Sequence, residues 1–263
     1  MSGSSDNAQD GRRKSGPAPL DPSVDAAEVA GFEALAGRWW DPDGPFRPLH
    51  RFNPVRVGFI RERACAHFDR AAAEPQPLAG LSLLDIGTGG GLVAEPMARL
   101  GAAVTGIDPA EKNIAAATAH AEAVGLGIAY RATTAESLAA GGGQFDIVLA
   151  LETVEHVAEL DTFLDAATRL VAPGGLFVAA TLNRTAKAYA LAIVGAEYVL
   201  GWLPRGTHDW NKFITPAELT AAIEAKGLNI GELTGVTFNP LTASWRLSRD
   251  TAVNYMVTAR KGP

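Results

Sequence analysis

The sequence predicts an α/β protein with a doubly wound, mostly parallel sheet, and two observations carry this prediction. Short, apolar, β-prone runs alternate with alanine-rich helical stretches through most of the chain. The first of these runs passes into a helical stretch through a turn with four glycines. In a doubly wound sheet, ligands bind at the carboxyl ends of the strands, near the point where the strand order reverses. The chain has 263 residues and is 47% hydrophobic, which suffices for one such domain with extensions.

Seven segments are expected to form the strands of the sheet. They are residues 82–86, 103–107, 128–131, 145–151, 176–182, 230–237 and 252–259. A helix is expected to begin after Thr215, because Pro216 suits the first helical position and Glu218 completes a capping box.

The glycine-rich turn reads Leu-Leu-Asp-Ile-Gly-Thr-Gly-Gly-Gly-Leu over residues 83–92. Glycines let a ligand lie against bare backbone, and the N–H groups at the following helix start can bind it. A dinucleotide fingerprint needs a third glycine where this chain has Leu92, which disfavours the rival class of NAD-dependent oxidoreductases. The pattern acidic-x-Gly-x-Gly-x-Gly is met by Asp85, Gly87, Gly89 and Gly91, and it resembles S-adenosylmethionine-dependent methyltransferases.

Asp108 follows the second expected strand and is the candidate ligand for a ribose. A carboxylate accepts two hydrogen bonds in one plane, which matches the two hydroxyls of a ribose. Asp108 can also cap the helix expected near Pro109, and the two roles are compatible.

Composition narrows the classes of partner. A net charge of -6 offers no basic field for nucleic acid. The single Cys65 cannot form an internal disulfide, which favours a reducing cytoplasm. Residues 1–22 contain too few apolar side chains to offset the entropy of ordering, so a disordered tail is expected, with no export or transit signal.

Residues 23–78 are expected to form a helical lid. Asp25 and Glu28 have capping-box spacing, and apolar residues then recur along one helical face at Val29, Phe32, Ala36 and Trp39. The proline-rich stretch 39–54 is expected to be an irregular loop, with Asn53 capping a helix that begins at Pro54. Arg56 would then lie in a first helical turn, where a positive charge is unfavourable, so it either contacts a ligand or pairs with an acid such as Glu62.

The residue that accepts the adenine amino group stays ambiguous. Thr134 occupies the position where methyltransferases usually have an acidic residue, and a hydroxyl can accept one hydrogen bond. Thr133 and Glu136 have capping-box spacing, so Glu136 has a structural role available to it.

The segment Leu151-Glu152-Thr153-Val154-Glu155-His156 follows the fourth expected strand, where a reacting group is expected. If a helix begins by Thr153, then Glu152, Glu155 and His156 share roughly one side of it. Two carboxylates and an imidazole can hold a divalent cation, with magnesium or manganese favoured over zinc. Acidic residues also suit a helix N-terminus electrostatically, so spacing alone leaves a structural role open.

Residues 184–205 are unusually apolar, and they are too short and interrupted to span a bilayer, which takes roughly 20 apolar residues. Basic and aromatic residues border this stretch. This composition suits a membrane interface, an apolar substrate tunnel or a buried lid helix. The candidates at its borders are Arg184, Lys187, Tyr189, Tyr198, Trp202 and Arg205.

Several separate motifs resemble one family, the ubiquinone-biosynthesis O-methyltransferases. The motifs span nearly everything after the tail. They are Phe-Glu-Ala at 32–34, Arg-Trp-Trp-Asp at 38–41, Pro-Leu-His-Arg at 48–51, Asn-Pro at 53–54, the glycine turn, Thr-Leu-Asn-Arg at 181–184, Val-Gly-Ala-Glu-Tyr at 194–198, Gly-Thr-His-Asp at 206–209 and Val-Asn-Tyr-Met at 253–256.

This resemblance implies a Rossmann-like class I methyltransferase fold, with a seven-stranded sheet that ends in an antiparallel pair. The domain would cover residues 79–263, with an insertion at 184–213. Arg56, Gly87, Asp108 and Leu151 would contact the methyl donor S-adenosylmethionine, and the glycine-rich motif adds Asp85 and Gly89 to its binding residues. Leu151 stands where the family often has methionine, and Thr88 where it often has cysteine. Both replacements preserve approximate size.

The resemblance also implies the reaction and its setting. The substrate would be a polyprenyl catechol or hydroquinone of the ubiquinone pathway, with His156 and Glu155 as catalytic residues. Eukaryotic relatives are associated with a magnesium site on a Glu-x-x-Glu-His motif, which Glu152, Glu155 and His156 reproduce. The enzyme would be cytoplasmic, in peripheral contact with the inner membrane through residues 184–205, with other quinone-biosynthesis proteins as possible partners. A different phenolic or carbon acceptor and a non-catalytic lipid-binding module are the alternatives.

Overall fold

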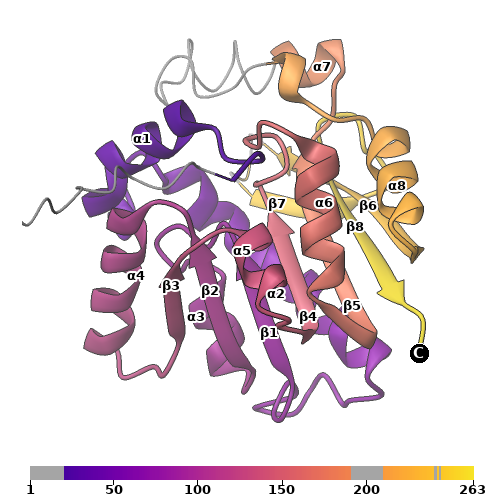
Figure 1. Cartoon of the computed structure of the whole chain (residues 1–263). Helices are drawn as coiled ribbons and strands as arrows, with labels where there is room; N and C mark the ends of the chain where they lie inside the picture. Colours follow the sequence, from indigo (N-terminus) through magenta and orange to yellow (C-terminus); the bar gives the residue numbers. More distant parts are fainter. Residues whose placement is uncertain (1–20, 191–209, 240–241, 243) are drawn as a thin grey trace, which may run out of the picture.

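The computed structural model describes residues 21–190, 210–239, 242 and 244–263 (Figure 1). The expected tail at 1–22 therefore lies almost entirely outside the described residues. The same holds for most of the apolar stretch at 184–205.

The described residues form one eight-stranded sheet with the order β3-β2-β1-β4-β5-β8-β6-β7. Strands β1 to β5 run parallel to one another, and the pairs β5–β8, β8–β6 and β6–β7 are antiparallel. The strand order reverses between β1 and β4. The strands are β1 (Ser82–Ile86), β2 (Ala103–Asp108), β3 (Ala129–Ala132), β4 (Phe145–Leu151), β5 (Val171–Leu182), β6 (Leu228–Asn239), β7 (Ser244–Ser248) and β8 (Asn254–Lys261).

The mostly parallel, doubly wound sheet is confirmed, but the expected number of strands is wrong by one. Each of the seven expected segments overlaps a strand, and β1 and β4 have the expected bounds. The additional strand is β7, which pairs with the end of β6 from Gly235↔Ser248 to Asn239↔Ser244. Strand β7 lies at the sheet edge, where its side chains are exposed or only half-buried. Its sequence therefore carries little strand signal.

Helices cover both faces of the sheet, and each face has its own apolar core. On one face, α5 (Ala135–Ala140), α6 (Leu160–Arg169) and α8 (Pro216–Ala225) pack on side chains such as Leu84 and Val148. On the other, α2 (Arg47–His67) and α3 (Ala94–Arg99) pack on Leu83 and Leu149. The alternation of these strand residues between the two cores follows the two-residue period of a strand. Helix α4 (Glu111–Ala123) lies beside β2 and β3.

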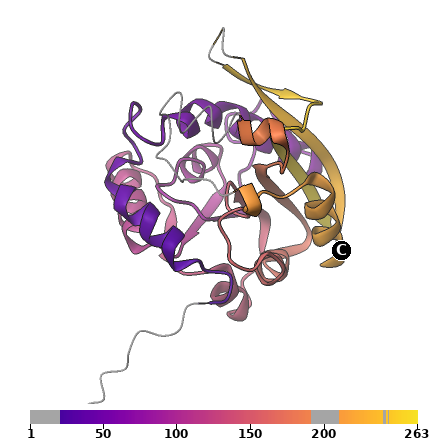
Figure 2. The same ribbon diagram turned by 90° about the horizontal axis from the view of Figure 1, so that it is seen from above.

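The segment before β1 supplies helix α1 (Ala26–Leu35), a short 3₁₀ helix at Ala36–Arg38, and α2. Asp25 caps α1 by accepting from the backbone N–H groups of Ala27 and Glu28. Figures 1 and 2 show α1 lying across the end of the sheet at which the parallel strands finish. This placement suits a lid over the ligand end of the sheet.

The predicted start of the second helix at Pro54 is wrong. Helix α2 begins at Arg47 and continues through Pro54, with Pro48 in its first turn. Proline in a helix interior removes one backbone hydrogen bond, and the sequence-based prediction gave that cost too much weight. The Asn53 side chain therefore does not cap α2, and instead donates to the Leu92 carbonyl over 2.6 Å.

The predicted start of α8 is confirmed. Thr215 and Glu218 form a complete capping box, with Pro216 at the first helical position. A three-residue helix, α7 (Ala186–Ala188), and a 3₁₀ helix at Trp210–Lys212 lie on either side of the undescribed residues 191–209.

Candidate active site

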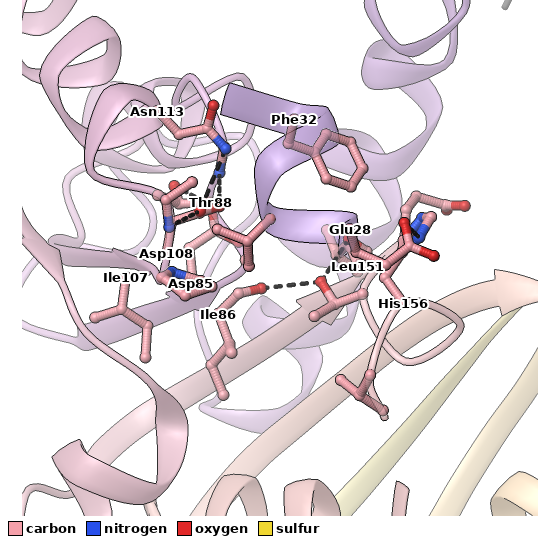
Figure 3. Close-up of a pocket in the computed structure, with 18 of the residues that line it drawn as sticks. Glu28, Phe32, Asp85, Ile86, Thr88, Ile107, Asp108, Asn113, Leu151 and His156 are labelled. Atoms are coloured by element: carbon pink, nitrogen blue, oxygen red, sulfur yellow. Dashed lines mark hydrogen bonds and ion pairs between the residues drawn. The ribbon is translucent and has the colours of Figure 1, made fainter. Parts of the chain in front are cut away.

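A cavity opens at the carboxyl ends of β1, β2 and β4, where the strand order reverses. Its floor is the glycine turn, and its cover comes from α1, the following 3₁₀ turn and the start of α2 (Figures 1 and 3). All of the sequence-predicted site residues line this cavity: Arg56, Asp85, Gly87, Gly89, Asp108, Leu151, Glu152, Glu155 and His156. The sequence thus identified residues that the fold brings together.

The glycine turn is tied to the neighbouring strand β2. The N–H groups of Gly87 and Thr88 both donate to the Ile107 carbonyl over 2.9 Å. Gly87 has a φ of +71°, and a Cβ there would lie 2.5 Å from Oγ1 of Thr153. Both the backbone conformation and the space therefore require glycine at this position.

Asp85 lies at the base of the turn and is 3% exposed. Its carboxylate accepts from Oγ1 of Thr88 over 2.7 Å. Burial raises the pKa of Asp85 to about 6, although the Thr88 hydrogen bond and the Arg56 charge act against this rise. A thiol, which the resemblance leads one to expect at this position, is a weaker hydrogen-bond donor than the Thr88 hydroxyl.

Asp108 ends β2 with its carboxylate at the cavity (Figure 3). Its Oδ1 accepts from the N–H of Ala110 over 2.9 Å and from Nδ2 of Asn113 over 3.2 Å. Its Oδ2 accepts from the N–H of Gly89 over 3.0 Å. The carboxylate thus holds the glycine turn and the start of α4 together and lines the cavity. The expected helix cap is wrong, because α4 begins at Glu111 with Ala110 as its N-cap.

Arg56 lies in the middle of α2 and is 3% exposed. Its guanidinium donates to Oδ1 of Asn53 over 3.1 Å and lies 5.0 Å from the centre of the Phe52 ring. Its Nε is buried without a hydrogen-bond partner. A buried guanidinium donor beside a cavity fits an anionic group of a ligand better than a surface ion pair with Glu62.

The prediction of a helix starting at Thr153 is wrong. Glu152 has a φ of +52°, residues 153–159 form turns, and α6 begins only at Leu160. The left-handed conformation of Glu152 ends the strand abruptly and breaks any helical spacing with Glu155 and His156. Burial and the nearby Glu155 carboxylate together raise the pKa of Glu152 to about 7, although the Arg56 and His156 charges act against this rise.

Glu155 and His156 are bound by different parts of the fold. Oε2 of Glu155 accepts from Oγ1 of Thr181, in β5, over 2.8 Å, and Glu155 is 3% exposed. Nδ1 of His156 lies 3.2 Å from Oε2 of Glu28, in α1, and its ring packs edge-on against Phe32. Burial alone would lower the pKa of His156, but Glu28, Glu155 and Glu152 outweigh burial and raise it.

These contacts do not build the metal site expected from the sequence. Among the residues that the structure describes, no three histidine, cysteine, aspartate or glutamate side chains are grouped so that they could hold a metal ion. Thr181 occupies only Oε2 of Glu155 and Glu28 faces only Nδ1 of His156, so Oε1 of Glu155 and Nε2 of His156 keep lone pairs. The three side chains are nevertheless not grouped as the ligands of one cation among the residues that the structure describes.

At the other end of the cavity, the residues after β3 contact the start of the described chain. Thr134 caps α5 by accepting from the N–H of Ser137 over 3.1 Å, and its hydroxyl donates to Asp21. Oε1 of Glu136 accepts from the N–H of Ser23 over 3.3 Å, while its Oε2 is buried without a partner. Thr134 and Glu136 both line the cavity, so both positions considered from the sequence are present.

Three further cavity residues were not identified from the sequence as parts of the site: Glu28, Trp39 and Asn113. Glu28 was assigned a local capping role, and Trp39 was assigned to the apolar face of a helix. Asn113 lies five residues beyond Asp108, in the first turn of the alanine-rich helix α4, and belonged to no motif.

Comparison with known proteins identifies the fold and the family. A family model described as "Methyltransferase domain" matches residues 84–179. The crystal structure of magnesium protoporphyrin IX methyltransferase from Synechocystis PCC 6803 with bound SAH has a TM-score of 0.63 and 20% sequence identity. That match covers 89% of this chain and 95% of the other, and it supports the methyltransferase fold.

Proteins found by sequence comparison share a much higher identity with this chain than that structure does. A protein named "Ubiquinone biosynthesis O-methyltransferase" from Methylobacterium sp. (strain 4-46) is 59% identical over 93% of this chain and 98% of its own length. One of the same name from Parvibaculum lavamentivorans is 59% identical over 91% of this chain and 94% of its own. With these relatives matched over nearly their full lengths, the chain belongs to the ubiquinone biosynthesis O-methyltransferase family of S-adenosylmethionine-dependent enzymes.

Proposed function

We propose that this enzyme transfers a methyl group from S-adenosylmethionine to an aromatic hydroxyl of polyprenyl catechol or hydroquinone intermediates of ubiquinone biosynthesis. The observation that carries the proposal is one cavity that is lined by the glycine turn, by His156 and by a wall of apolar side chains. That wall is formed by Phe32, Trp39, Phe46, Leu49 and Phe163. Apolar and aromatic side chains suit an aromatic acceptor with a hydrocarbon tail.

The donor is assigned to the turn by the chemistry of its own groups. Asp108 offers a carboxylate to the ribose, and Arg56 offers its unpaired Nε–H to the carboxylate of the methionine part. Gly87, Gly89 and Leu151 bring backbone close to the ligand, and Asp85 holds the turn through Thr88.

His156 is the proposed base for the acceptor. Its Nδ1 is held by the Glu28 carboxylate, which favours the tautomer with the proton on Nδ1 and a free lone pair on Nε2. Nε2 then takes the proton of the aromatic hydroxyl as its oxygen attacks the methyl carbon. The carbon–sulfur bond breaks and its electron pair returns to sulfur, which gives an aryl methyl ether and S-adenosylhomocysteine.

A base is needed because a phenol is a weak nucleophile. With tyrosine's pKa of about 10 as a guide, forming the phenolate at pH 7 costs about 4 kcal/mol. A histidine of raised pKa accepts the proton more readily, and the neighbouring Glu155 carboxylate stabilises the imidazolium that forms. The cavity lowers the activation barrier further by aligning the attacking oxygen, the methyl carbon and the sulfur.

A divalent cation, held by Glu152, Glu155 and His156 and with magnesium as the first candidate, stays a prediction of the sequence. The side-chain contacts described above do not support it, and no step of this mechanism passes through a metal. Its test is chelation.

Contact with the inner membrane from the cytoplasmic side is the second part of the proposal. Among the described residues, no helix is both long and apolar enough to cross a membrane. Tyr189 and Trp210 stand on either side of the undescribed stretch 191–209 and are 48% and 37% exposed. Exposed aromatic residues beside an apolar stretch suit an interfacial contact, where the prenylated substrate and other quinone-biosynthesis proteins would be met.

The deciding experiment is transfer of radiolabelled methyl from S-adenosylmethionine to a short-tailed prenyl catechol. The proposal requires a labelled methyl ether whose formation falls strongly in His156→Ala, while S-adenosylhomocysteine binding is retained. Transfer to simple catechols but not to prenylated ones would favour a different phenolic acceptor. Donor binding without any transfer would favour a non-catalytic lipid-binding module.

A further inference from the structure

Asn113 is a buried polar residue of the cavity that the mechanism above does not use. It lies in α4, is 1% exposed, and lines the cavity beside Asp108 (Figure 3). Its Oδ1 accepts from Nε1 of Trp39 over 2.9 Å, and its Nδ2 donates to Oδ1 of Asp108 over 3.2 Å. A residue of the lid is thereby joined through Asn113 to the proposed ribose ligand.

The two neighbours fix which way the Asn113 amide points. Tryptophan Nε1–H is only a donor, so the amide oxygen must face Trp39. An ionised carboxylate is only an acceptor, so the amide nitrogen must face Asp108. Trp39 itself is 7% exposed and lies flat against Phe46, with ring centres 3.6 Å apart. The indole is thus held in place, and it holds the amide.

The hydrogen-bond capacity of Asp108 shows why a second group is needed. A carboxylate has about four acceptor positions. Three positions on Asp108 are taken, by Ala110, Asn113 and Gly89. A ribose brings two hydroxyls, so one acceptor position remains for two donors. The Asn113 amide nitrogen carries two N–H groups, and within the described part of the chain only one of them has a partner.

We propose that Asn113 is a second ribose ligand, which donates its free N–H to a ribose hydroxyl oxygen while Trp39 fixes its orientation. The proposal rests on the proposed assignment of Asp108 to the ribose. It makes Trp39 a positioning residue that acts through Asn113. Donor affinity then depends on the Trp39 indole, because its N–H holds the amide oxygen.

The test compares two ligands by calorimetry: S-adenosylhomocysteine and an analogue without the two ribose hydroxyls. Asn113→Ala should weaken S-adenosylhomocysteine by about tenfold or more, as expected for loss of a buried hydrogen bond beside a charge. The same variant should weaken the analogue by less than about threefold. A residue with a merely structural role would weaken both ligands equally, and equal losses would overturn the proposal.

Trp39→Phe keeps an aromatic ring in the lid and removes only the N–H, so it should show the same ligand-dependent loss in milder form. Combined with Asn113→Ala it should add little, because both substitutions break one chain of contacts. Trp40→Phe is the matched control: it removes the neighbouring indole N–H, which donates to the Gly90 carbonyl, and should combine additively with Asn113→Ala. Additive losses for Trp39→Phe as well would overturn the positioning role. If Asn113→Ala fails to fold, Trp39→Phe measured with both ligands carries the test.

Asp108→Ala separates this inference from the proposed function on which it rests. If that variant binds both ligands as the wild type does, the assignment of Asp108 to the ribose fails. If it loses S-adenosylhomocysteine selectively while Asn113→Ala does not, only the role of Asn113 fails.

Discussion

Nδ1 of His156 lies 3.2 Å from Oε2 of Glu28, and this contact joins the loop after β4 to the lid helix α1. The other carboxylate oxygen of Glu28 accepts from Nζ of Lys212 over 2.9 Å, and Lys212 also reaches Asp25. Lys212 lies seven residues beyond Arg205, the end of the stretch proposed to contact the membrane. One carboxylate of the lid therefore connects the proposed base to the segment that follows that stretch.

This pair predicts a shift in the pH profile. Burial lowers the pKa of His156, and Glu28 is the largest contribution that raises it. A base works only when it is neutral, so activity is lost as pH falls through the raised pKa. Glu28→Gln removes the negative charge while burial remains, so the acidic limb of kcat should move to lower pH. Measuring kcat against pH with a short-tailed catechol checks this prediction.

Asp25→Asn is the matched control for Glu28→Gln. It removes a carboxylate from the same Lys212, but Asp25 does not contact His156. Its acidic limb should stay where the wild type has it. An unmoved limb in Glu28→Gln would mean that His156 is not the group titrating in the profile.

Asp108→Ala should remove most of the affinity for S-adenosylhomocysteine and leave the fold intact. Each charge-assisted hydrogen bond to the ribose contributes about 1.5 to 3 kcal/mol. Calorimetry measures the loss, and circular dichroism checks that the sheet remains. Near-wild-type affinity in this variant would contradict the ribose assignment.

The sheet and most of the site were predictable because their signals are local. The apolar runs that became β1 and β4 have their bounds set by flanking turns, and Asp85, Gly87 and Asp108 follow from their distance to the strand ends. Arg56 was placed at the start of a helix, but the structure buries it in the middle of one. Tertiary packing overrode the local preference of Pro54 there.

Contacts between distant segments were not predictable. Nothing near Glu152 in the sequence indicates its positive φ of +52°. Likewise, the bond from Trp39 to Asn113 joins residues 74 positions apart. Sequence periodicity assigned Trp39 to a helix face without indicating its partner, and Asn113 belonged to no motif.

Gly89 gives a prediction that follows from such a distant contact. It has a φ of +53°, and a Cβ there would lie 2.5 Å from the Trp39 ring. Gly89→Ala should therefore push the lid indole away, weaken S-adenosylhomocysteine binding and lower the free energy of unfolding by more than the roughly 1 kcal/mol that a positive φ costs. Thermal unfolding and calorimetry measure the two effects.

Gly80→Ala is the control for Gly89→Ala. Gly80 also has a positive φ, of +80°, but a Cβ there would have no atom within 4 Å. It should show the backbone cost alone, with unchanged donor affinity. Equal effects of the two substitutions would show that the Trp39 contact with the turn is unimportant for binding.

Exhaustive chelation tests the cation predicted from the sequence. If Glu152, Glu155 and His156 ligate magnesium during turnover, chelation stops methyl transfer and added magnesium restores it. Nε2 of His156 and Oε1 of Glu155 are the atoms left free to ligate it, because Nδ1 faces Glu28 and Oε2 accepts from Thr181. The crystal structure of a magnesium complex would show these two atoms at the ion. Transfer that is indifferent to chelator and to magnesium would leave His156, held by Glu28, as a base that works without metal.

The last prediction concerns the apolar stretch 184–205, which we expect to dock on the membrane surface. Each methylene moved from a lipid into water costs about 0.8 kcal/mol, so a polyprenyl tail cannot leave the bilayer freely. An apolar segment that touches the lipid lets the aromatic head reach the cavity while the tail stays in a hydrocarbon environment. The net charge of -6 limits long-range attraction to anionic lipid, so binding should be reversible and depend on the apolar side chains as well as on the basic rim.

Co-sedimentation with anionic vesicles measures this binding. The double substitution Ile193→Asp and Leu200→Asp introduces two charges into the apolar stretch and should abolish co-sedimentation. The variant should still bind S-adenosylhomocysteine and methylate a short-tailed catechol, because none of the donor ligands assigned above lies in residues 184–205. The long-tailed substrate in vesicles should become a poor substrate for it. Undiminished vesicle binding by the variant would mean that the stretch is a lid that does not touch the lipid.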